Sequence, residues 1–204
     1  MTRYAMAIDK ARCIGCKTCL MACKVSNNLP KGVWYNRYET EGAEHEYCAV
    51  GEFPQLSMVS YTVACQHCAN PACVAVCPTN ATQQDENGIV FVDESLCIGC
   101  KACIDACPYD VRTLLEEVEP YADVTFGRPT AKEHMAGTVE KCDFCRDLIE
   151  QGKNPACMDL CPARARFWGD IEDPESEISK LIAEREYDLL KEDMGTQPMV
   201  FYLK

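Results

Sequence analysis

Sixteen of the seventeen cysteines in this 204-residue chain fall into four groups of four, and thiolates at such short spacings are typical ligands of metal centres. The first and third groups share the spacing C-x2-C-x2-C-x3-C. The second is spaced C-x2-C-x4-C-x3-C and the fourth C-x2-C-x11-C-x3-C. The groups are Cys13, Cys16, Cys19 and Cys23; Cys65, Cys68, Cys73 and Cys77; Cys97, Cys100, Cys103 and Cys107; and Cys142, Cys145, Cys157 and Cys161.

The spacing of the third group, with proline after its last cysteine, is the signature of bacterial cubane [4Fe–4S] sites. Two-residue gaps let a tight loop bring three thiolates to three corners of one cube, while the fourth cysteine ligates a second cluster. Gly15 and Gly99 let these loops stay close to a cluster, where amides can approach its sulfurs. At four cysteines per cluster we predict four [4Fe–4S] clusters, with Cys48 left over as a buried or half-buried free thiol.

Zinc sites and disulfides are the other uses of so many cysteines. The fourth group alone leaves zinc open, because Cys142 and Cys145 could form one knuckle of a four-cysteine zinc site. The first and third groups fit zinc poorly, since zinc has no use for a third cysteine two residues further on. A disulfide framework would need an oxidising compartment and would not repeat this spacing. We therefore favour iron–sulfur clusters.

Composition and sequence patterns argue against several other classes of function. A net charge of −12 argues against a nucleic-acid partner, because phosphate binding calls for basic patches. No run approaches the roughly 18 apolar residues that span a bilayer, and MTRYAMAIDK shows neither a signal-peptide core nor paired arginines. No catalytic constellation stands out, so we predict no catalytic residues. His67 lies within CQHC, where a ring N–H could reach a cluster sulfur, but packing within the loop is the commoner role.

The elements that must position the cysteines are short. YAMAID before the first group and GIVFVD before the third predict strands that lead into the loops, so one building block is used twice. Weaker versions, MVSYTVAC and GTVEKC, lead into the other two groups. Short helices are expected at Thr18–Ser26 and Ala102–Cys107. Segments 31–60 and 113–136 interrupt this pattern and contain aromatic residues, which suggests insertions. They could cover the clusters from water or dock a partner, and we favour the covering role.

The last part of the chain reads as structural. DPESEISKLIAERE predicts a helix with Asp173 as N-cap and Pro174 at its first position. A final strand is expected from Met199 to Leu203. The apolar face of the helix would be Ile178, Leu181 and Ile182.

The four groups in this order, with the long gap in the fourth, resemble the iron–sulfur electron-transfer (beta) subunits of DMSO-reductase-family molybdopterin oxidoreductases. The phrases YAMAIDKARCIGCKTCLMACK, ACQHCANPACVAVCP, EKCDFC and PACMDLCPARARFWGD carry the resemblance across essentially the whole chain, and so does GTQPMVFYL. One departure is Lys24, where proline is expected. The resemblance implies an α+β fold of two pseudo-symmetric bacterial-ferredoxin-like modules. These are an outer module, 1–30 plus 137–204, and an inner module, 61–112, with insertions at 31–60 and 113–136.

Crossed ligation is also implied by the resemblance: group one would share its clusters with group four, and group two with group three. The implied sets are Cys13, Cys16, Cys19 and Cys161 (cluster A); Cys23, Cys142, Cys145 and Cys157 (cluster B); Cys65, Cys68, Cys73 and Cys107 (cluster C); and Cys77, Cys97, Cys100 and Cys103 (cluster D).

In function, the resemblance implies a non-catalytic subunit that conducts electrons. Its partners would be a large catalytic subunit with a molybdenum or tungsten bis-pterin centre and a quinol-linked membrane subunit or a soluble carrier. The chain would be cytoplasmic as synthesised, or membrane-associated, or exported together with a signal-bearing partner. Two alternatives stay open: a ferredoxin-type subunit of a hydrogenase or another non-molybdenum complex, and a structural zinc module without a redox role.

Overall fold

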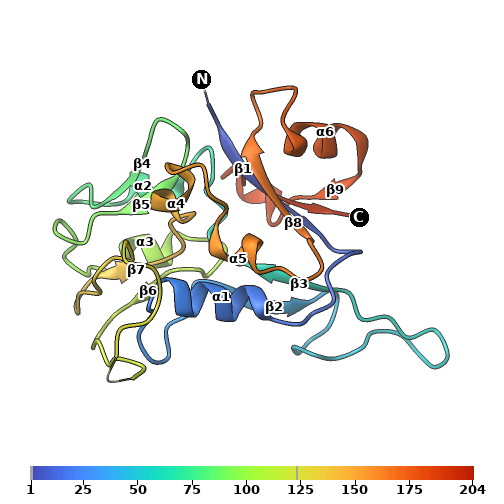
Figure 1. Ribbon diagram of the computed structural model, residues 1–204, viewed down its shortest axis with the longest axis horizontal. Coiled ribbons are helices and arrows are strands. Elements are labelled where there is room, and N and C mark those ends of the chain that lie inside the picture. Colours follow the sequence, from blue (N-terminus) through green and yellow to red (C-terminus); the bar gives the residue numbers. More distant parts are fainter. Residues whose placement is uncertain (1, 123) are drawn as a thin grey trace.

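A four-stranded sheet joins the two ends of the chain in the computed structural model, which describes residues 2–122 and 124–204. Its strand order is β8-β1-β10-β9. Strand β1 (Tyr4–Asp9) runs parallel to β10 (Val200–Leu203) and antiparallel to β8 (Arg166–Asp170). At the edge, β9 (Tyr187–Asp188) pairs antiparallel with β10. The segments before the first and after the last cysteine group therefore lie side by side (Figure 1).

Alternate residues of β1 serve two different packing layers, as the two-residue period of a strand requires. Ala5 and Ala7 pack beneath helix α6 (Glu177–Glu184), where Ile178 is fully buried. Met6 and Ile8 face the other way and pack in the core that holds the loops of the fourth cysteine group. The sheet thus separates a covering helix from the cysteine loops.

The apolar face expected for the C-terminal helix, Ile178, Leu181 and Ile182, is confirmed by its packing on the sheet. The expected N-cap is wrong. Ser176 caps α6 by accepting the N–H of Ser179, and its hydroxyl also donates to the carbonyl of Asp170. Asp173 instead accepts the N–H of Glu175 in the preceding turn, so the helix begins one turn later.

Each cysteine group follows a short strand, as the sequence predicts. β1 precedes the first group, β3 (Ser60–Val63) the second, β5 (Val90–Val92) the third and β7 (Val139–Glu140) the fourth. The last three each pair antiparallel with the strand before them along the chain. Those partners are β2 (Arg37–Thr40), β4 (Thr82–Gln84) and β6 (Thr113–Leu114).

Short helices carry many of the cysteines. α1 (Thr18–Ser26) has its predicted bounds, whereas α3 (Ala102–Asp105) ends before the expected Cys107, next to Pro108. α1 packs against α5 (Ala156–Asp159), and α2 (Ala72–Ala75) packs against α3. The remaining helices are α4 (Arg146–Ile149) and the 3-10 helix η1 (Glu192–Met194). Among the described residues, no helix is long and apolar enough to cross a bilayer.

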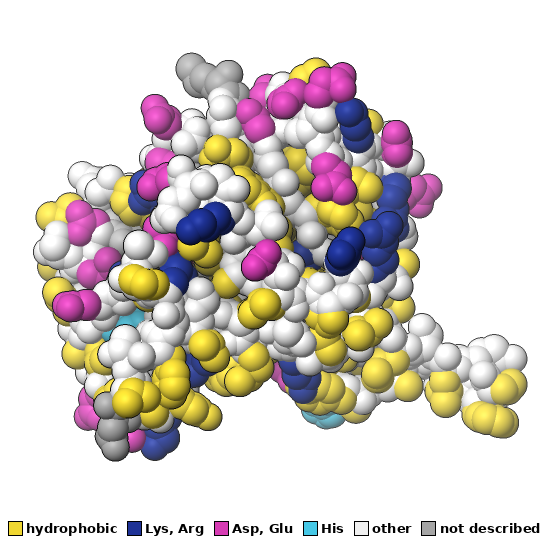
Figure 2. Space-filling view, in the orientation of Figure 1, with side chains coloured by type: hydrophobic (Ala, Val, Ile, Leu, Met, Phe, Trp, Pro, Cys, Tyr) yellow, Lys and Arg dark blue, Asp and Glu magenta, His cyan; other side chains and the backbone are white. Residues whose placement is uncertain are grey.

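Only part of the first insertion, residues 31–60, is buried as a covering segment should be. Tyr35 and Tyr38 are buried, as residues of a covering segment should be. Beyond them, the chain between β2 and β3 leaves the body as an arm with apolar side chains along it (Figures 1 and 2). Phe53 on this arm is 88% exposed. Cys48 lies on the same arm and is exposed, so the expectation of a buried or half-buried thiol is wrong: the arm has no core to pack it in.

Because Cys48 stands apart from the four groups, we expect Cys48→Ser to leave the iron content per chain unchanged. Iron would be measured on protein purified without oxygen, beside the unsubstituted chain. Loss of iron in this variant would show that the seventeenth cysteine is a ligand.

Candidate metal centres

All four cysteine groups share one backbone feature, a left-handed residue just before the second cysteine. The φ angles are 65° at Gly15, 42° at His67, 64° at Gly99 and 63° at Phe144. Glycine adopts this conformation freely, whereas other residues pay about 1–2 kcal/mol. His67 and Phe144 are both almost fully buried, and their rings pack edge to face with centroids 5.1 Å apart. This packing offsets the strain, so three different sequences, CIGC (used twice), CQHC and CDFC, make the same turn.

The first and fourth groups meet at a cavity beside β1 and β8. Its walls include Ile8, Thr62 and Arg166. The backbone N–H of Ala165 donates to the sulfur of Cys161 over 3.4 Å. The cysteines that line this cavity are Cys13, Cys16, Cys19 and Cys161.

A second cavity lies where the second and third groups meet. Val90, Tyr109 and Arg112 form part of its wall. Burial acts to raise the pKa of Cys65, but the nearby His67, Lys141 and Arg112 hold it well below its usual value. The lining cysteines are Cys65, Cys68, Cys73 and Cys107.

A third set of thiols gathers where α1 packs on α5. Burial raises the pKa of Cys23 well above its usual value, and the sulfurs of Cys142, Cys157 and Cys145 raise it further. Asp143 adds a negative charge to the same place. Three cysteines of the fourth group therefore surround the last cysteine of the first.

The remaining four cysteines of the second and third groups are Cys77, Cys97, Cys100 and Cys103. Cys77 follows α2 and Cys103 lies on α3, and these two helices pack together. Backbone N–H groups already point at two of the sulfurs: Thr82 donates to Cys77 over 3.3 Å and Val139 to Cys97 over 3.4 Å. Cys100 is exposed to solvent.

The chemistry of these donors fits an iron–sulfur cluster. Buried thiols that raise one another's pKa stay protonated on their own, and a cationic iron core would stabilise all of them as thiolates. A zinc ion would need its sulfur ligands about 2.3 Å away. Within residues 2–122 and 124–204, no three His, Cys, Asp or Glu side chains converge closely enough to hold a single ion.

His67, for which the sequence favours a packing role, is also a candidate hydrogen-bond donor to a cluster. Its Nδ1 accepts the backbone N–H of Val90 over 3.1 Å, so the neutral ring carries its proton on Nε2. Nε2 is buried and has no hydrogen-bond partner among the described residues. A hydrogen bond from this ring would favour the thiolate of the neighbouring Cys65. The sulfur of Cys65 or of a bound cluster would supply the partner that this N–H needs.

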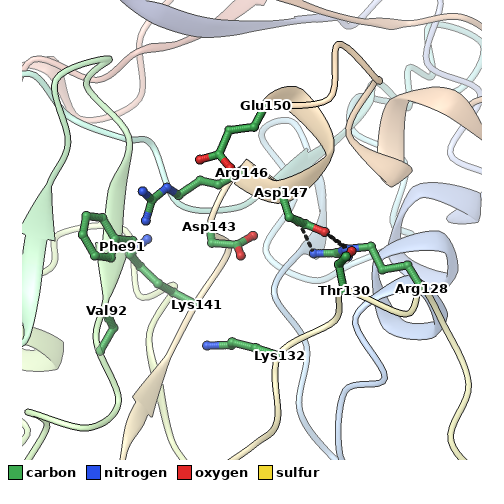
Figure 3. A pocket seen from close by; sticks show the side chains of 10 residues that line it. All are labelled: Phe91, Val92, Arg128, Thr130, Lys132, Lys141, Asp143, Arg146, Asp147 and Glu150. Atoms are coloured by element: carbon green, nitrogen blue, oxygen red, sulfur yellow. Dashed lines mark hydrogen bonds and ion pairs between the residues drawn. The ribbon is translucent and has the colours of Figure 1, made fainter.

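A polar pocket of about 330 Å³ lies outside the cysteine-lined cavities, next to α4 and β5 (Figure 3). Arg128 and Thr130 both bind Asp147 there. The Nζ of Lys141, on the same wall, donates to the carbonyls of Val90 and Cys142. These charged groups already pair with protein atoms. They form a layer of ion pairs and hydrogen bonds beside the third set of thiols.

Two family descriptions match the chain. The 4Fe-4S dicluster domain matches residues 56–127 and 117–171, which together contain the second, third and fourth cysteine groups. The 4Fe-4S binding domain matches residues 10–26, which contain the first.

Similar proteins extend over the whole chain. A Halobacterium salinarum protein named as an iron–sulfur subunit of dimethyl sulfoxide reductase is 42% identical, covering 100% of this chain and 79% of that protein. A tetrathionate reductase subunit of Salmonella typhimurium is 38% identical, over 98% of this chain and 72% of its own length. The arsenate respiratory reductase iron–sulfur subunit of a Shewanella species is 34% identical, over 99% and 96%.

Proposed function

Because the chain belongs to the iron–sulfur electron-transfer subunits of DMSO-reductase-family molybdopterin oxidoreductases, we propose that it conducts electrons through four [4Fe–4S] clusters to or from a molybdopterin catalytic subunit. The observation that carries this proposal is a cavity lined by three cysteines of one group and one cysteine from a distant group. Each cluster, when bound, supplies a centre that takes up and releases one electron.

We propose the crossed ligand sets that the resemblance implies. Two of them coincide with the cysteine-lined cavities, which supports clusters A and C. The neighbours of Cys23 support cluster B. For cluster D the support is the packing of α2 on α3. The sets are Cys13, Cys16, Cys19 and Cys161 (A); Cys23, Cys142, Cys145 and Cys157 (B); Cys65, Cys68, Cys73 and Cys107 (C); and Cys77, Cys97, Cys100 and Cys103 (D).

The protein's own part is to hold these centres apart from water and to set how easily each is reduced. Backbone N–H groups that point at sulfur favour the reduced state, because they stabilise added negative charge. Buried cations act in the same direction and buried carboxylates in the opposite one. The surroundings of cluster C, with Lys141 and Arg112, therefore differ from those of cluster B, with Asp143.

We further propose that the fold consists of two pseudo-symmetric ferredoxin-like modules, an outer one (1–30 plus 137–204) and an inner one (61–112). The sheet that joins β1, β8 and β10 supports the outer module, since it unites both ends of the chain. At the boundary with the first insertion, β3 begins at Ser60 and pairs with β2, so the inner module and the insertion share a two-stranded sheet.

The proposed partners are a large subunit with a molybdenum or tungsten bis-pterin centre and a quinol-linked membrane subunit or a soluble carrier. The names of the relatives include reductases of dimethyl sulfoxide, tetrathionate and arsenate. With such partners, the chain would work at the membrane surface or beside a soluble electron carrier.

The test is to purify the native complex without oxygen, identify its subunits and metals, and reduce it with dithionite. Dimethyl sulfoxide, tetrathionate and arsenate are then added separately, and the visible absorption of the clusters is followed. We expect a molybdenum- or tungsten-containing partner and rapid reoxidation by one of these compounds. A complex whose only large partner carries nickel and iron, or no pterin metal at all, would contradict the proposal and favour the hydrogenase-type alternative.

Asp143 should lower the reduction potential of cluster B, since it lies beside three of its cysteines and its carboxylate accepts the N–H of Cys145. We expect Asp143→Asn to raise this potential by on the order of 59 mV, a tenfold change in a one-electron equilibrium. Potentials would be measured by redox titration followed by electron paramagnetic resonance.

Asp159→Asn is the matched control, because this exposed carboxylate lies two residues after Cys157 and is screened by water. It should leave all four potentials unchanged. An unchanged or lowered potential in Asp143→Asn would rule out the electrostatic role.

A further inference from the structure

Two buried arginines occupy equivalent places after the third and fourth cysteine groups. Arg112 lies five residues after Cys107 and Arg166 five residues after Cys161, in each case following the proline of the motif. The second group has Thr82 at the same distance from Cys77. This threonine accepts a hydrogen bond from Arg112 over 3.2 Å.

Neither guanidinium has its charge balanced by a carboxylate. Arg112 is 5% exposed and Arg166 is 8% exposed, and among the described residues neither forms an ion pair with Asp or Glu. Arg166 donates to the hydroxyl of Thr62 over 2.7 Å, which is a neutral partner. A buried charge without a counter-charge is costly, so each arginine needs an anion nearby.

Each arginine also has an unused hydrogen-bond donor. The Nη1 of Arg166 and the Nη2 of Arg112 are buried, and neither has a hydrogen-bond partner within residues 2–122 and 124–204. Arg166 forms part of the wall of the first cysteine-lined cavity, and Arg112 part of the second. The free N–H groups thus belong to the side chains that border the cavities of clusters A and C.

The cysteines whose charge acts on each arginine come from two different ligand sets. Burial acts to lower the pKa of Arg166, but three cysteines together with Tyr202 more than offset it; the cysteines are Cys157, Cys19 and Cys142. Of these cysteines, Cys19 belongs to the proposed cluster A, whereas Cys142 and Cys157 belong to cluster B. Arg112 is held charged in the same way, against its burial, by three cysteines of cluster C and by Cys103 of cluster D.

We propose that Arg166 and Arg112 are charge bridges, each placed between the two clusters of one pair and raising the reduction potential of both. The inference rests on the proposed function, since it takes the four clusters as present. Four thiolates around a [4Fe–4S]²⁺ core carry a net charge of −2, and reduction adds one electron to make it −3. A fixed positive charge in a buried setting favours that added electron, and a free N–H directed at a sulfur does the same.

The experiment uses the complete complex, purified without oxygen, with Arg166→Gln and Arg112→Gln in this chain. All four potentials are measured by redox titration followed by electron paramagnetic resonance. Arg166→Gln should reduce the equilibrium constant for reduction of clusters A and B at least tenfold, a fall of about 59 mV for each. Arg112→Gln should do the same to clusters C and D.

Matched variants separate charge from packing. Arg164→Gln removes the same charge from an exposed position two residues before Arg166 and should change no potential. Arg166→Lys and Arg112→Lys keep the charge and should restore at least half of the fall. If a glutamine variant does not assemble, Arg166→Met or Arg112→Met, with a long apolar side chain, should show the same fall.

Two results would overturn the inference: full iron content with unchanged potentials in both neutral variants, or lysine variants that match the glutamine variants. The proposed function fails separately, through the unsubstituted complex. If that complex lacks four [4Fe–4S] signals, the proposed cluster content is wrong before any arginine is changed.

Discussion

Cys100→Ser is expected to stop electron flow through the native complex while leaving its catalytic subunit active. Cys100 is one of three cysteines that the third group would give to cluster D, and a hard serine oxygen is a poor substitute for a soft thiolate. Losing one centre interrupts a series of one-electron steps. We expect turnover with the physiological electron donor to fall at least tenfold, whereas an artificial dye that reduces the catalytic subunit directly should sustain nearly full turnover.

The side chain at position 100 is exposed, so the exchange of sulfur for oxygen disturbs little packing. Cys48→Ser makes the same exchange at another exposed cysteine and should leave both activities intact. Full activity with the physiological donor in Cys100→Ser would contradict a role for this chain in conducting electrons.

Gly99→Ala should have the second largest effect, because the loop around this glycine has no room for a side chain. A Cβ here would overlap the carbonyl oxygen of Gly137 and come within 3.3 Å of the Leu114 side chain. Leu114 belongs to β6, which pairs with β7, and the N–H of Gly137 donates to the carbonyl of Leu115, so backbone pairing fixes both neighbours. The third cysteine loop must therefore shift, and iron should fall from about sixteen to about twelve atoms per chain as cluster D is lost.

Gly152→Ala isolates the cost of backbone conformation from that of the clash. Gly152 has a φ of +72°, close to the +64° of Gly99, but no atom lies within 4 Å of a Cβ at that position. This control should lose about 1–2 kcal/mol of stability and no iron. Equal iron content in the two variants would show that the close approach at Gly99 is not needed for the cluster.

The sequence predicts this chain well wherever a short pattern carries the information. Cysteine spacing identifies the four groups, short apolar runs identify the strands before them, and α1 has its predicted bounds. Which distant cysteines meet depends on tertiary packing, such as α1 against α5. No spacing rule contains that information, so the ligand sets rested on resemblance.

The features that the sequence does not reveal depend on contacts between distant segments. His67 and Phe144 occupy left-handed positions that glycine holds in the other two loops, because their rings pack on each other. The roles of Arg112 and Arg166 depend on burial, and an arginine is usually exposed. Cys48 lies on an arm that leaves the body, which composition alone does not predict.

The most direct test of the account is the amount of iron and inorganic sulfide per chain in the native complex, purified without oxygen. Four [4Fe–4S] clusters require about sixteen atoms of each per chain. We expect that result, together with a brown colour that bleaches on reduction. A colourless protein with zinc in place of iron, or with iron and sulfide well below about sixteen, would contradict the claim that this chain carries four iron–sulfur clusters.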